Sequence, residues 1–380
     1  MGEEFVCPNC GNHNSRYIGF KDNKPYCRLC VSMRPKEKIT ANISGKATLH
    51  LNYPLTDKQF EVSEQVLNNF KEKLNTLIYA VTGAGKTELV YKTMLYALTN
   101  KLSVGFAVPR KQVVIELAER IKKAFIDNKV ISVYGGHTDN LTGEIIVLTT
   151  HQLYRYQNYF DLLILDEIDA FPFKDSELLN NMFHKAVKGN YILMSATPND
   201  ETINYFKKED RRIVFLNERH HKKSIPVPKI IIASGYTKHI RLIRELKRFI
   251  LKNKKVFVFC PTIERAASIY FILSHYIKAG ELIHSKIKNQ AEIISDFKLG
   301  KYDYLVTTAV LERGVTVKGL QVIVMDADHT IYDRYSLEQI SGRVGRDHNE
   351  PEGEVIYIAN NESIEMEESI KKIISYNEHL

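Results

Sequence analysis

The chain has 380 residues, of which 44% are hydrophobic, and it carries a formal net charge of +8 at pH 7. This length exceeds one ordinary domain and accommodates two or three. No run approaches the ~18 uninterrupted apolar residues of a membrane-spanning helix, and the first residues lack the features of a secretory signal. We therefore expect a cytoplasmic protein that could meet a membrane only through a partner. The positive charge favours an anionic partner.

Residues 1–45 contain two pairs of cysteines, Cys7 with Cys10 and Cys27 with Cys30, in the spacing C-x₂-C-x₁₆-C-x₂-C. This spacing is typical of a four-thiolate zinc site, and a reducing cytosol disfavours the alternative of two disulfides. The head is poor in apolar residues, so we expect Zn²⁺ to stabilise it and the rest of the chain to keep separate cores. Its interleaved basic and aromatic residues suit contact with a nucleic-acid strand and equally a solvated face, so both interpretations stay open.

The segment 80–87 reads Ala-Val-Thr-Gly-Ala-Gly-Lys-Thr, after an apolar run and before a helical pattern. This is the strand-loop-helix setting of a phosphate-binding loop, although Ala80 replaces the usual first glycine. Glycines let the main chain approach the phosphates, Lys86 neutralises their charge and Thr87 can ligate Mg²⁺. We predict that a nucleoside triphosphate is held by Thr82, Gly83, Ala84, Gly85, Lys86 and Thr87.

A second apolar run, at 160–165, ends in Asp166-Glu167-Ile168-Asp169. It predicts a buried parallel strand, and open α/β sheets place ligands at the carboxyl ends of such strands. We expect Asp166 to hold Mg²⁺ through water and Glu167 to polarise the attacking water. The alternative is an acid-rich surface turn, which the preceding strand makes less favourable.

Alternating apolar strands and helical patterns predict an α/β fold with two lobes, at 46–222 and 223–380, each built on a mostly parallel, doubly wound sheet. A basic segment with two prolines, 219–228, separates them. Strands are expected near 77–81, 103–108, 130–134, 145–149, 161–165 and 191–195 in the first lobe, and near 229–234, 256–260, 281–283, 304–308, 321–326 and 354–359 in the second.

The second lobe carries Gln339-x-x-Gly342-Arg343-x-Gly345-Arg346. A permanently charged, planar guanidinium can bridge phosphate oxygens as charge develops during phosphoryl transfer. We expect Arg343 and Arg346 to act in this way and Gln339 to orient the water. The active site would then be complete only when the lobes close.

These motifs, in their order with Leu55-Thr56-x-x-Gln59 and Ser195-Ala196-Thr197, resemble those of superfamily 2 helicases. The run Asp-Glu-Ile-Asp-Ala-Phe-Pro-Phe at 166–173, the run Thr-Thr-His-Gln-Leu at 149–153 and the four-cysteine head are similar to the ComFA family, the competence-associated DNA-uptake ATPases of Gram-positive bacteria. The likeness covers nearly the whole chain. It implies two RecA-like lobes and an ATP-driven motor on single-stranded DNA, with Gln59 and Gly314 added to the nucleotide site.

The resemblance also implies partners and DNA contacts. The partners would be single-stranded DNA, the competence DNA-uptake machinery at the inner membrane face and a small phosphoribosyltransferase-like competence protein. Hydroxyls, backbone N–H groups and an arginine at strand ends suit phosphate contacts that read no bases. The residues implied are Pro109, Arg110, Gly136, Thr149, Thr150, His151, Pro261, Thr262, Thr307 and Thr308.

Three hypotheses for function follow. The first is a single-strand DNA translocase that hydrolyses ATP. The second is a duplex-separating helicase of primosome or recombination type, or an RNA helicase, with the same motor. The third is a zinc-dependent nucleic-acid binder whose grip is switched by nucleotide without directional movement. Intact Lys86, Glu167, Arg343 and Arg346 favour an active motor.

Overall fold

The structure of the chain is a computed structural model. It describes residues 5–8, 10–31, 39–51, 53–81, 83–168, 176–216, 218, 224–311, 317–346, 350 and 352–378. Thr82 and Gly314, both assigned to the nucleotide, lie outside the described residues, as do Asp169 and residues 219–223 of the basic segment 219–228.

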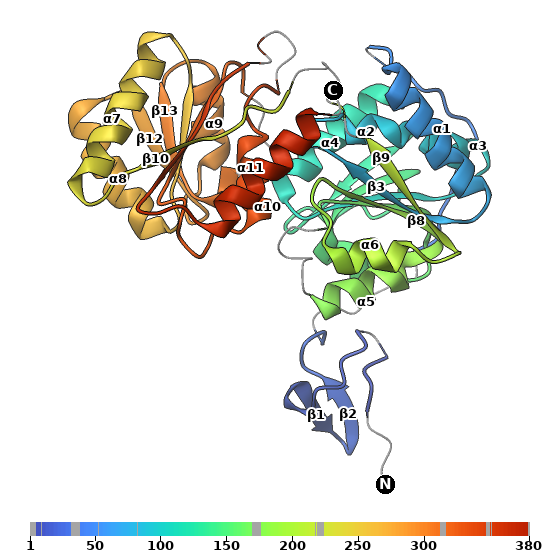
Figure 1. The fold of residues 1–380 in the computed structure, drawn as a ribbon. Helices are drawn as coiled ribbons and strands as arrows, with labels where there is room; N and C mark the ends of the chain where they lie inside the picture. The colour runs from blue at the N-terminus through green and yellow to red at the C-terminus, as the bar shows by residue number, and fades with distance from the viewer. Residues whose placement is uncertain are drawn as a thin grey trace. The chain divides into compact units, whose positions relative to one another are not determined.

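The described chain divides into two compact units, each built around one parallel sheet (Figure 1). The first unit, lobe 1, contains a seven-stranded sheet in the order β5-β6-β4-β7-β8-β3-β9. Its elements are α1 (Asp57–Lys71), β3 (Asn75–Ala80), α2 (Lys86–Leu89), α3 (Tyr91–Thr99), β4 (Val104–Val108), α4 (Lys111–Ala124), β5 (Val130–Val133), β6 (Ile145–Thr149), the 3₁₀ helix η2 (Thr150–Arg155), β7 (Phe160–Asp166), α5 (Glu177–Ala186), β8 (Val187–Ser195), α6 (Asp200–Phe206) and β9 (Arg211–Leu216).

The predicted strands of lobe 1 are confirmed, and their sequences explain their position. In β4 and β6 every residue is buried, because helices cover both faces of a parallel sheet. Figure 1 shows α5 and α6 on one face and α1 and α3 on the other. Strand β9 was not predicted. It begins with Arg211 and Arg212 and lies at the edge of the sheet, where only part of the strand is buried.

The second unit, lobe 2, contains a six-stranded parallel sheet in the order β10-β15-β14-β11-β13-β12. Two apolar clusters fill its two faces, one under α7 and α8 and the other under α9, α10 and α11. The elements are β10 (Lys229–Ile232), α7 (Tyr236–Leu251), β11 (Val256–Phe259), α8 (Ile263–Tyr276), β12 (Gly280–Ile283), α9 (Gln290–Lys298), β13 (Tyr304–Thr307), the 3₁₀ helix η3 (Ala309–Leu311), β14 (Gln321–Met325), α10 (Arg334–Ser341), β15 (Val355–Ala359) and α11 (Ile364–Asn377).

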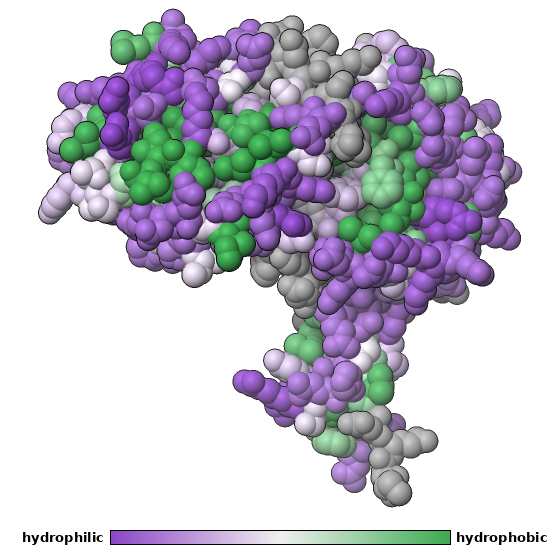
Figure 2. Space-filling model, in the orientation of Figure 1, coloured by the Kyte–Doolittle hydropathy of each residue, from purple (hydrophilic) through white to green (hydrophobic). Residues whose placement is uncertain are grey.

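The four-cysteine head forms a small module with η1 (Ser15–Tyr17) and the antiparallel pair β1 (Ile18–Lys21) and β2 (Lys24–Cys27). Asp22 and Asn23 make the tight turn between the strands with φ of 50° and 59°, a conformation that these two residue types tolerate. The module exposes hydrophobic residues among hydrophilic ones (Figure 2), including Val6, Phe20 and Val31.

The expectation that the module and lobe 1 keep separate cores is wrong. All four cysteines belong to the same apolar cluster as Leu179, Met182 and Phe183 of α5. The reason is size, since a module this small cannot enclose its own apolar side chains and packs them against a neighbouring helix instead.

The chain between the module and α1 also runs along lobe 1. Ser44 binds Glu144 through its backbone N–H (2.8 Å) and its hydroxyl (2.7 Å), and Asn128 donates to the carbonyl of Lys46 (2.9 Å). The domain boundary at 45 stays a prediction. Within the part of the chain that the structure describes, no helix has the length and apolar character to cross a bilayer.

Candidate functional site

The phosphate-loop sequence connects β3 to α2 in the geometry that its glycines require. Gly83 and Gly85 have φ of 87° and 76°, a region in which other side chains are strained. A Cβ on Gly85 would also lie 2.7 Å from Nε2 of Gln59. Two conditions, conformation and space, therefore favour glycine at position 85.

Gln59 is held beside this loop by the start of α1. The backbone N–H of Gln59 donates to Oγ1 of Thr56 (3.2 Å), and the backbone N–H of Thr56 donates to Oε1 of Gln59 (3.0 Å). This reciprocal pair is a capping box, which fixes the side chain that it uses. Gln59 and Gly85 are 26 residues apart in the sequence, and the structure brings them into contact distance.

Lys86 folds back over the loop, and its Nζ donates to the carbonyl oxygen of Ala80 (3.3 Å). Lys86 and Thr87 are both half-buried, whereas Ala80 and Ala84 are buried. The unusual first residue, Ala80, is thus the last residue of β3, and its carbonyl positions the lysine that the loop chemistry needs.

Three neighbouring strands carry the nucleotide motifs to one edge of the lobe 1 sheet. Strand β8 lies between β3 and β7, and all three are parallel. In this register Tyr79 pairs with Ser195, and Asp166 pairs with Met194. Adjacent strands are about 4.8 Å apart, so the loop after β3 and the acids after β7 leave the sheet on the order of 10 Å from each other.

The two predicted acids have a constrained backbone. The N–H of Glu167 donates to Oδ1 of Asp166 (2.8 Å), and Glu167 has a φ of 57°. A left-handed conformation at a residue other than glycine costs about 1–3 kcal/mol and is concentrated at functional sites. Both side chains are half-buried. The φ of Glu167 therefore supports a functional role for this residue.

Ser195 and Thr197, at the end of the intervening strand β8, are 1% and 4% exposed. Oγ of Ser195 accepts the backbone N–H of Thr197 (2.9 Å). The two hydroxyl residues therefore form a compact turn between the phosphate loop and the acids.

Sequence reasoning missed an ion pair between a buried glutamate and an exposed arginine beside the loop. Glu88 follows Thr87 directly and is 7% exposed, and its Oε1 pairs with Nη2 of Arg120 (2.6 Å) and accepts from the hydroxyl of Tyr53 (3.3 Å). Burial, together with the charge of Glu88, raises the pKa of Tyr53. Arg120 belongs to α4 and lies 32 residues after Glu88 in the sequence. No local sequence pattern could therefore predict this pair.

The arginine motif of lobe 2 lies on and just after α10. Gln339 is 6% exposed within the helix, and Arg343 is 2% exposed in the turn that follows Ser341, the last helical residue. Arg346 is half-buried, and its Nε donates to the carbonyl of Gly342 (2.9 Å). The structure brings these three residues to one end of one helix.

The implied DNA contacts of lobe 1 lie at the carboxyl ends of β4, β5 and β6. Pro109 and Arg110 follow β4, Gly136 follows β5, and Thr149 ends β6. Two of the hydroxyls are buried, with Thr149 8% and Thr150 0% exposed, whereas His151 is exposed. Pro109 is buried and Arg110 half-buried.

In lobe 2, Pro261 and Thr262 follow β11, Thr307 ends β13 and Thr308 follows it. Oγ1 of Thr262 accepts the backbone N–H of Arg265 (3.1 Å) and so caps α8. Thr307 is buried and donates its hydroxyl to the carbonyl of Thr308 (3.0 Å). The hydroxyls of Thr262 and Thr307 each have a structural partner, and the role of this set in binding DNA stays a prediction.

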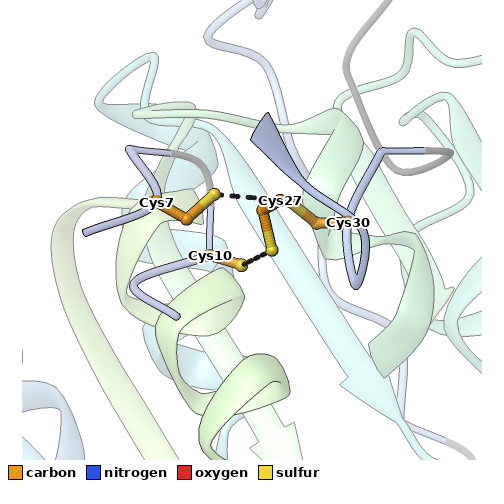
Figure 3. Close-up of side chains that lie close together, drawn as sticks. All are labelled: Cys7, Cys10, Cys27 and Cys30. Atoms are coloured by element: carbon orange, nitrogen blue, oxygen red, sulfur yellow. Dashed lines mark hydrogen bonds between the residues drawn. The ribbon is translucent and has the colours of Figure 1, made fainter. Parts of the chain in front are cut away.

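The four cysteines converge on one point (Figure 3), two from the N-terminal loop and two from the end of β2 and the turn after it. Their sulfurs all lie within 4.8 Å of one another, with 3.5 Å between Cys7 and Cys30 and 3.6 Å between Cys10 and Cys27. These separations are too long for disulfide bonds. Four thiolates at Zn–S bonds of about 2.3 Å would have sulfurs about 3.8 Å apart, so the cluster fits a tetrahedral metal ion.

Two family models match the chain, "Type III restriction enzyme, res subunit" over residues 52–200 and "Helicase conserved C-terminal domain" over residues 237–348. Competence protein ComFA of Bacillus subtilis is 34% identical over 98% of this chain and 86% of its own length, and ComFA of Streptococcus pneumoniae is 30% identical over 93% and 85%. ATP-dependent DNA helicase RecG of Streptococcus pneumoniae is 25% identical over 82% of the chain but 49% of the relative.

Solved structures show the same fold. Dbp5 of S. cerevisiae bound to RNA and ADP BeF3 superposes with a TM-score of 0.64 at 16% identity, covering 86% of this chain and 92% of Dbp5. RecG bound to a three-way DNA junction gives a TM-score of 0.62 at 18% identity, covering 90% of this chain and 48% of RecG. The two matched helicase domains indicate an ATP-dependent enzyme of superfamily 2. With two near-full-length relatives at 30% identity or more, the chain belongs to the ComFA family of helicase-like competence proteins.

Proposed function

We propose that this chain is an ATP-driven motor that moves along single-stranded DNA and drives the import of transforming DNA during natural competence. One observation carries the proposal. The phosphate loop, Ser195 with Thr197, and the acid pair Asp166 and Glu167 leave three adjacent parallel strands at one edge of lobe 1. The residues predicted to bind the triphosphate and those predicted to act on the attacking water therefore lie at the same edge of the sheet.

In this proposal the residues of lobe 1 bind ATP and orient the water. Lys86 exchanges its bond to Ala80 for phosphate oxygens, and Gln59, which lies beside Gly85, contacts the nucleotide. Glu167, directed by its constrained backbone, accepts a proton from the attacking water. Thr87 and Asp166 would hold Mg²⁺, which supplies positive charge to the phosphates when bound.

Arg343 and Arg346 complete the chemistry from lobe 2 by stabilising charge on the transferred phosphoryl group, with Gln339 orienting the water. Because the proposed catalytic residues are divided between the two lobes, hydrolysis would require closure of the lobes. Alternate gripping of the strand by Thr149 and Thr150 in one lobe and Thr307 and Thr308 in the other would turn closure into movement.

The cysteine cluster is proposed to bind one Zn²⁺ as a structural ion. Four buried sulfurs at tetrahedral spacing, with no open position among the four cysteine ligands, match a structural and not a catalytic site. Burial raises the pKa of the Cys10 thiol, and a bound Zn²⁺ would supply the positive charge that offsets thiolate charge in this buried cluster.

A steady-state ATPase assay tests the proposal with single-stranded DNA, duplex DNA and RNA of matched length. We expect strong stimulation by single-stranded DNA, little dependence on base sequence and a marked dependence on salt, since phosphate neutralisation releases counterions. Movement is tested by displacement of streptavidin from end-biotinylated single strands. DNA-stimulated hydrolysis without displacement from either end would support a nucleotide-controlled switch in place of the motor.

A second candidate, a duplex-separating helicase, is favoured by the similarity to RecG, an ATP-dependent DNA helicase. The chain matches only 49% of that relative, so the similarity supports the shared motor and leaves strand separation to be tested. A strand-displacement assay on a tailed duplex distinguishes the two. Unwinding of the duplex region would favour the helicase, and translocation on the single-stranded tail alone would favour the translocase.

In the cell, we infer that the motor works with the competence DNA-uptake machinery at the inner membrane face and with a phosphoribosyltransferase-like competence protein. The support is membership of the ComFA family. Association with membranes would then require these partners. Pull-down of the tagged protein from competent cells, with and without a membrane-solubilising detergent, tests this inference.

A further inference from the structure

A stacked aromatic pair lies at the carboxyl end of the edge strand of lobe 1. Tyr134 directly follows β5, the outermost strand of the sheet, and its ring stacks on the imidazole of His137 with centroids 4.9 Å apart and planes 19° from parallel. Nζ of Lys111, the first residue of α4, lies 4.8 Å from the centre of the Tyr134 ring. Two π-systems and a cation are thus assembled at one point.

The turn that joins the two rings is short and is closed by two backbone hydrogen bonds. The N–H of His137 donates to the carbonyl of Tyr134 (2.9 Å), and the N–H of Tyr134 donates back to His137 (3.3 Å). These bonds form an isolated antiparallel bridge. The two residues between the rings are glycines, and an added Cβ on either Gly135 or Gly136 would meet no described atom within 4 Å. The top of the turn is therefore open.

The rings are accessible on their outer side. Tyr134 is half-buried, and His137, Gly135 and Gly136 are exposed. A stacked pair covers its two inner faces, so the exposed imidazole offers its outer face to a ligand. A core role does not explain this pair, because an exposed histidine contributes little burial.

We propose that Tyr134 and His137 form a stacking platform for one unpaired base of a nucleic-acid strand, with Lys111 reinforcing the platform and attracting the strand. The inference rests on the proposed function, which places a single strand at this edge of the sheet. Bases of every kind have a π-face, so a stacking platform is tolerant of sequence. A base inside a duplex is already stacked on its neighbours, so the platform selects single strands.

The position of the platform supports this assignment. Strands β5, β6 and β4 are neighbours in that order, so the turn after β5 lies at the same sheet edge as Thr149 and Arg110. Contacts of Arg110 to phosphates would set the path of the strand, and the platform would take one base along it. The open glycine turn leaves space for a sugar-phosphate backbone to pass.

The test compares two fluorescent oligonucleotides of equal length and charge, one of thymidine and one of abasic deoxyribose phosphate. Binding of each is measured by anisotropy for the wild-type chain and for His137→Ala, without nucleotide. The wild type should bind the thymidine strand more tightly. His137→Ala should weaken that binding about fivefold or more, the scale of a lost base-stacking contact, and leave the abasic strand unchanged.

Two further variants separate stacking from other effects. His137→Phe should keep the preference for the thymidine strand, because a phenyl ring restores the outer face. His275→Ala, at an exposed histidine of α8 that contacts Phe271 (centroids 4.7 Å), is the matched control and should change neither affinity.

Each outcome is informative. Equal affinity of the wild type for both strands, or an unchanged preference in His137→Ala, overturns the platform while leaving the motor intact. Loss of the preference in His137→Phe as well as in His137→Ala points to damage of the turn and also overturns it. Failure of the wild type to bind either strand overturns the proposed function itself, and the platform with it.

Discussion

The side-chain amide of Asn181 on α5 donates a 2.7 Å hydrogen bond to the backbone carbonyl of Cys10. Gly11 follows with a φ of 73°, and a Cβ there would lie 2.5 Å from Nδ2 of Asn181. The cysteine knuckle and α5 thus meet at close range. Helix α5 leads into β8, so this contact connects the four-cysteine module to the element that ends in Ser195.

Asn181→Ala should loosen the module on α5 without unfolding lobe 1. A hydrogen bond of this kind contributes about 0.5–1.5 kcal/mol, so removal of zinc by a chromogenic chelator should become about 2- to 10-fold faster. Asn180→Ala, at the exposed neighbouring position, is the control and should match the wild type. Identical release rates for all three proteins would contradict a role for this contact in holding the module.

Replacing Cys27 and Cys30 by Ser should release the metal and also destabilise lobe 1. The four cysteines share an apolar cluster with Leu179, Met182 and Phe183, so an unfolded module would expose part of that helix face. We expect zinc content to fall to background and a lower melting temperature for lobe 1, with lobe 2 unaffected. Metal analysis and calorimetry measure both quantities. A variant that keeps stoichiometric metal contradicts the four-thiolate site.

The sequence was sufficient to predict the buried strands and the motifs. It was not sufficient to predict which residues pack against those motifs. Buried parallel strands such as β4 and β6 are continuous apolar runs, which identifies them without a structure. Edge strand β9 begins with two arginines, so it is not a continuous apolar run and was not predicted.

Contacts between residues that are far apart in the sequence could not be predicted from the sequence pattern. Asn181 and Cys10 are separated by 171 residues, and Glu88 and Arg120 by 32, so their pairing is set by packing of whole elements. The order that places β8 between β3 and β7 likewise arises from chain topology. Motif spacing could place each residue at a strand end, but it could not say which strand ends are adjacent.

Arg343→Ala should abolish turnover and largely preserve nucleotide binding. Arginine groups of this type contribute about 10³- to 10⁵-fold to phosphoryl transfer, whereas the loop amides that are proposed to bind the phosphates remain. Lys86→Ala should instead weaken nucleotide binding itself. Fluorescent-nucleotide titration and DNA-stimulated turnover distinguish the two variants. Arg241→Ala, exposed on α7, is the control. Full activity of Arg343→Ala would contradict the proposal that Arg343 takes part in hydrolysis.

Glu338, next to Gln339 on α10, makes the stability of lobe 2 dependent on pH. Burial raises the pKa of Glu338 to about 7, although Arg334 and Lys372 oppose the shift. Its carboxyl is buried near Arg334, with Oε1 of Glu338 3.2 Å from Nε of that residue, and it accepts from the hydroxyl of Tyr376 (3.4 Å). A raised pKa in the folded state means that the fold favours the protonated form.

The stability of lobe 2 should fall as pH rises, because the folded and unfolded chains release the Glu338 proton at different pH. The unfolded chain ionises this group near its ordinary pKa of about 4.3, whereas the folded chain retains the proton to about pH 7, so the stabilising contribution is complete at low pH and is lost as pH rises through 7. Glu338→Gln is permanently neutral. It should therefore become progressively more stable than the wild type between pH 5 and pH 8, by up to about 3 kcal/mol, and the difference should level off above pH 8. Urea unfolding of both proteins across this range measures it, with Glu362→Gln, exposed before α11, as the control. A difference that is constant with pH would show that Glu338 does not carry the raised pKa.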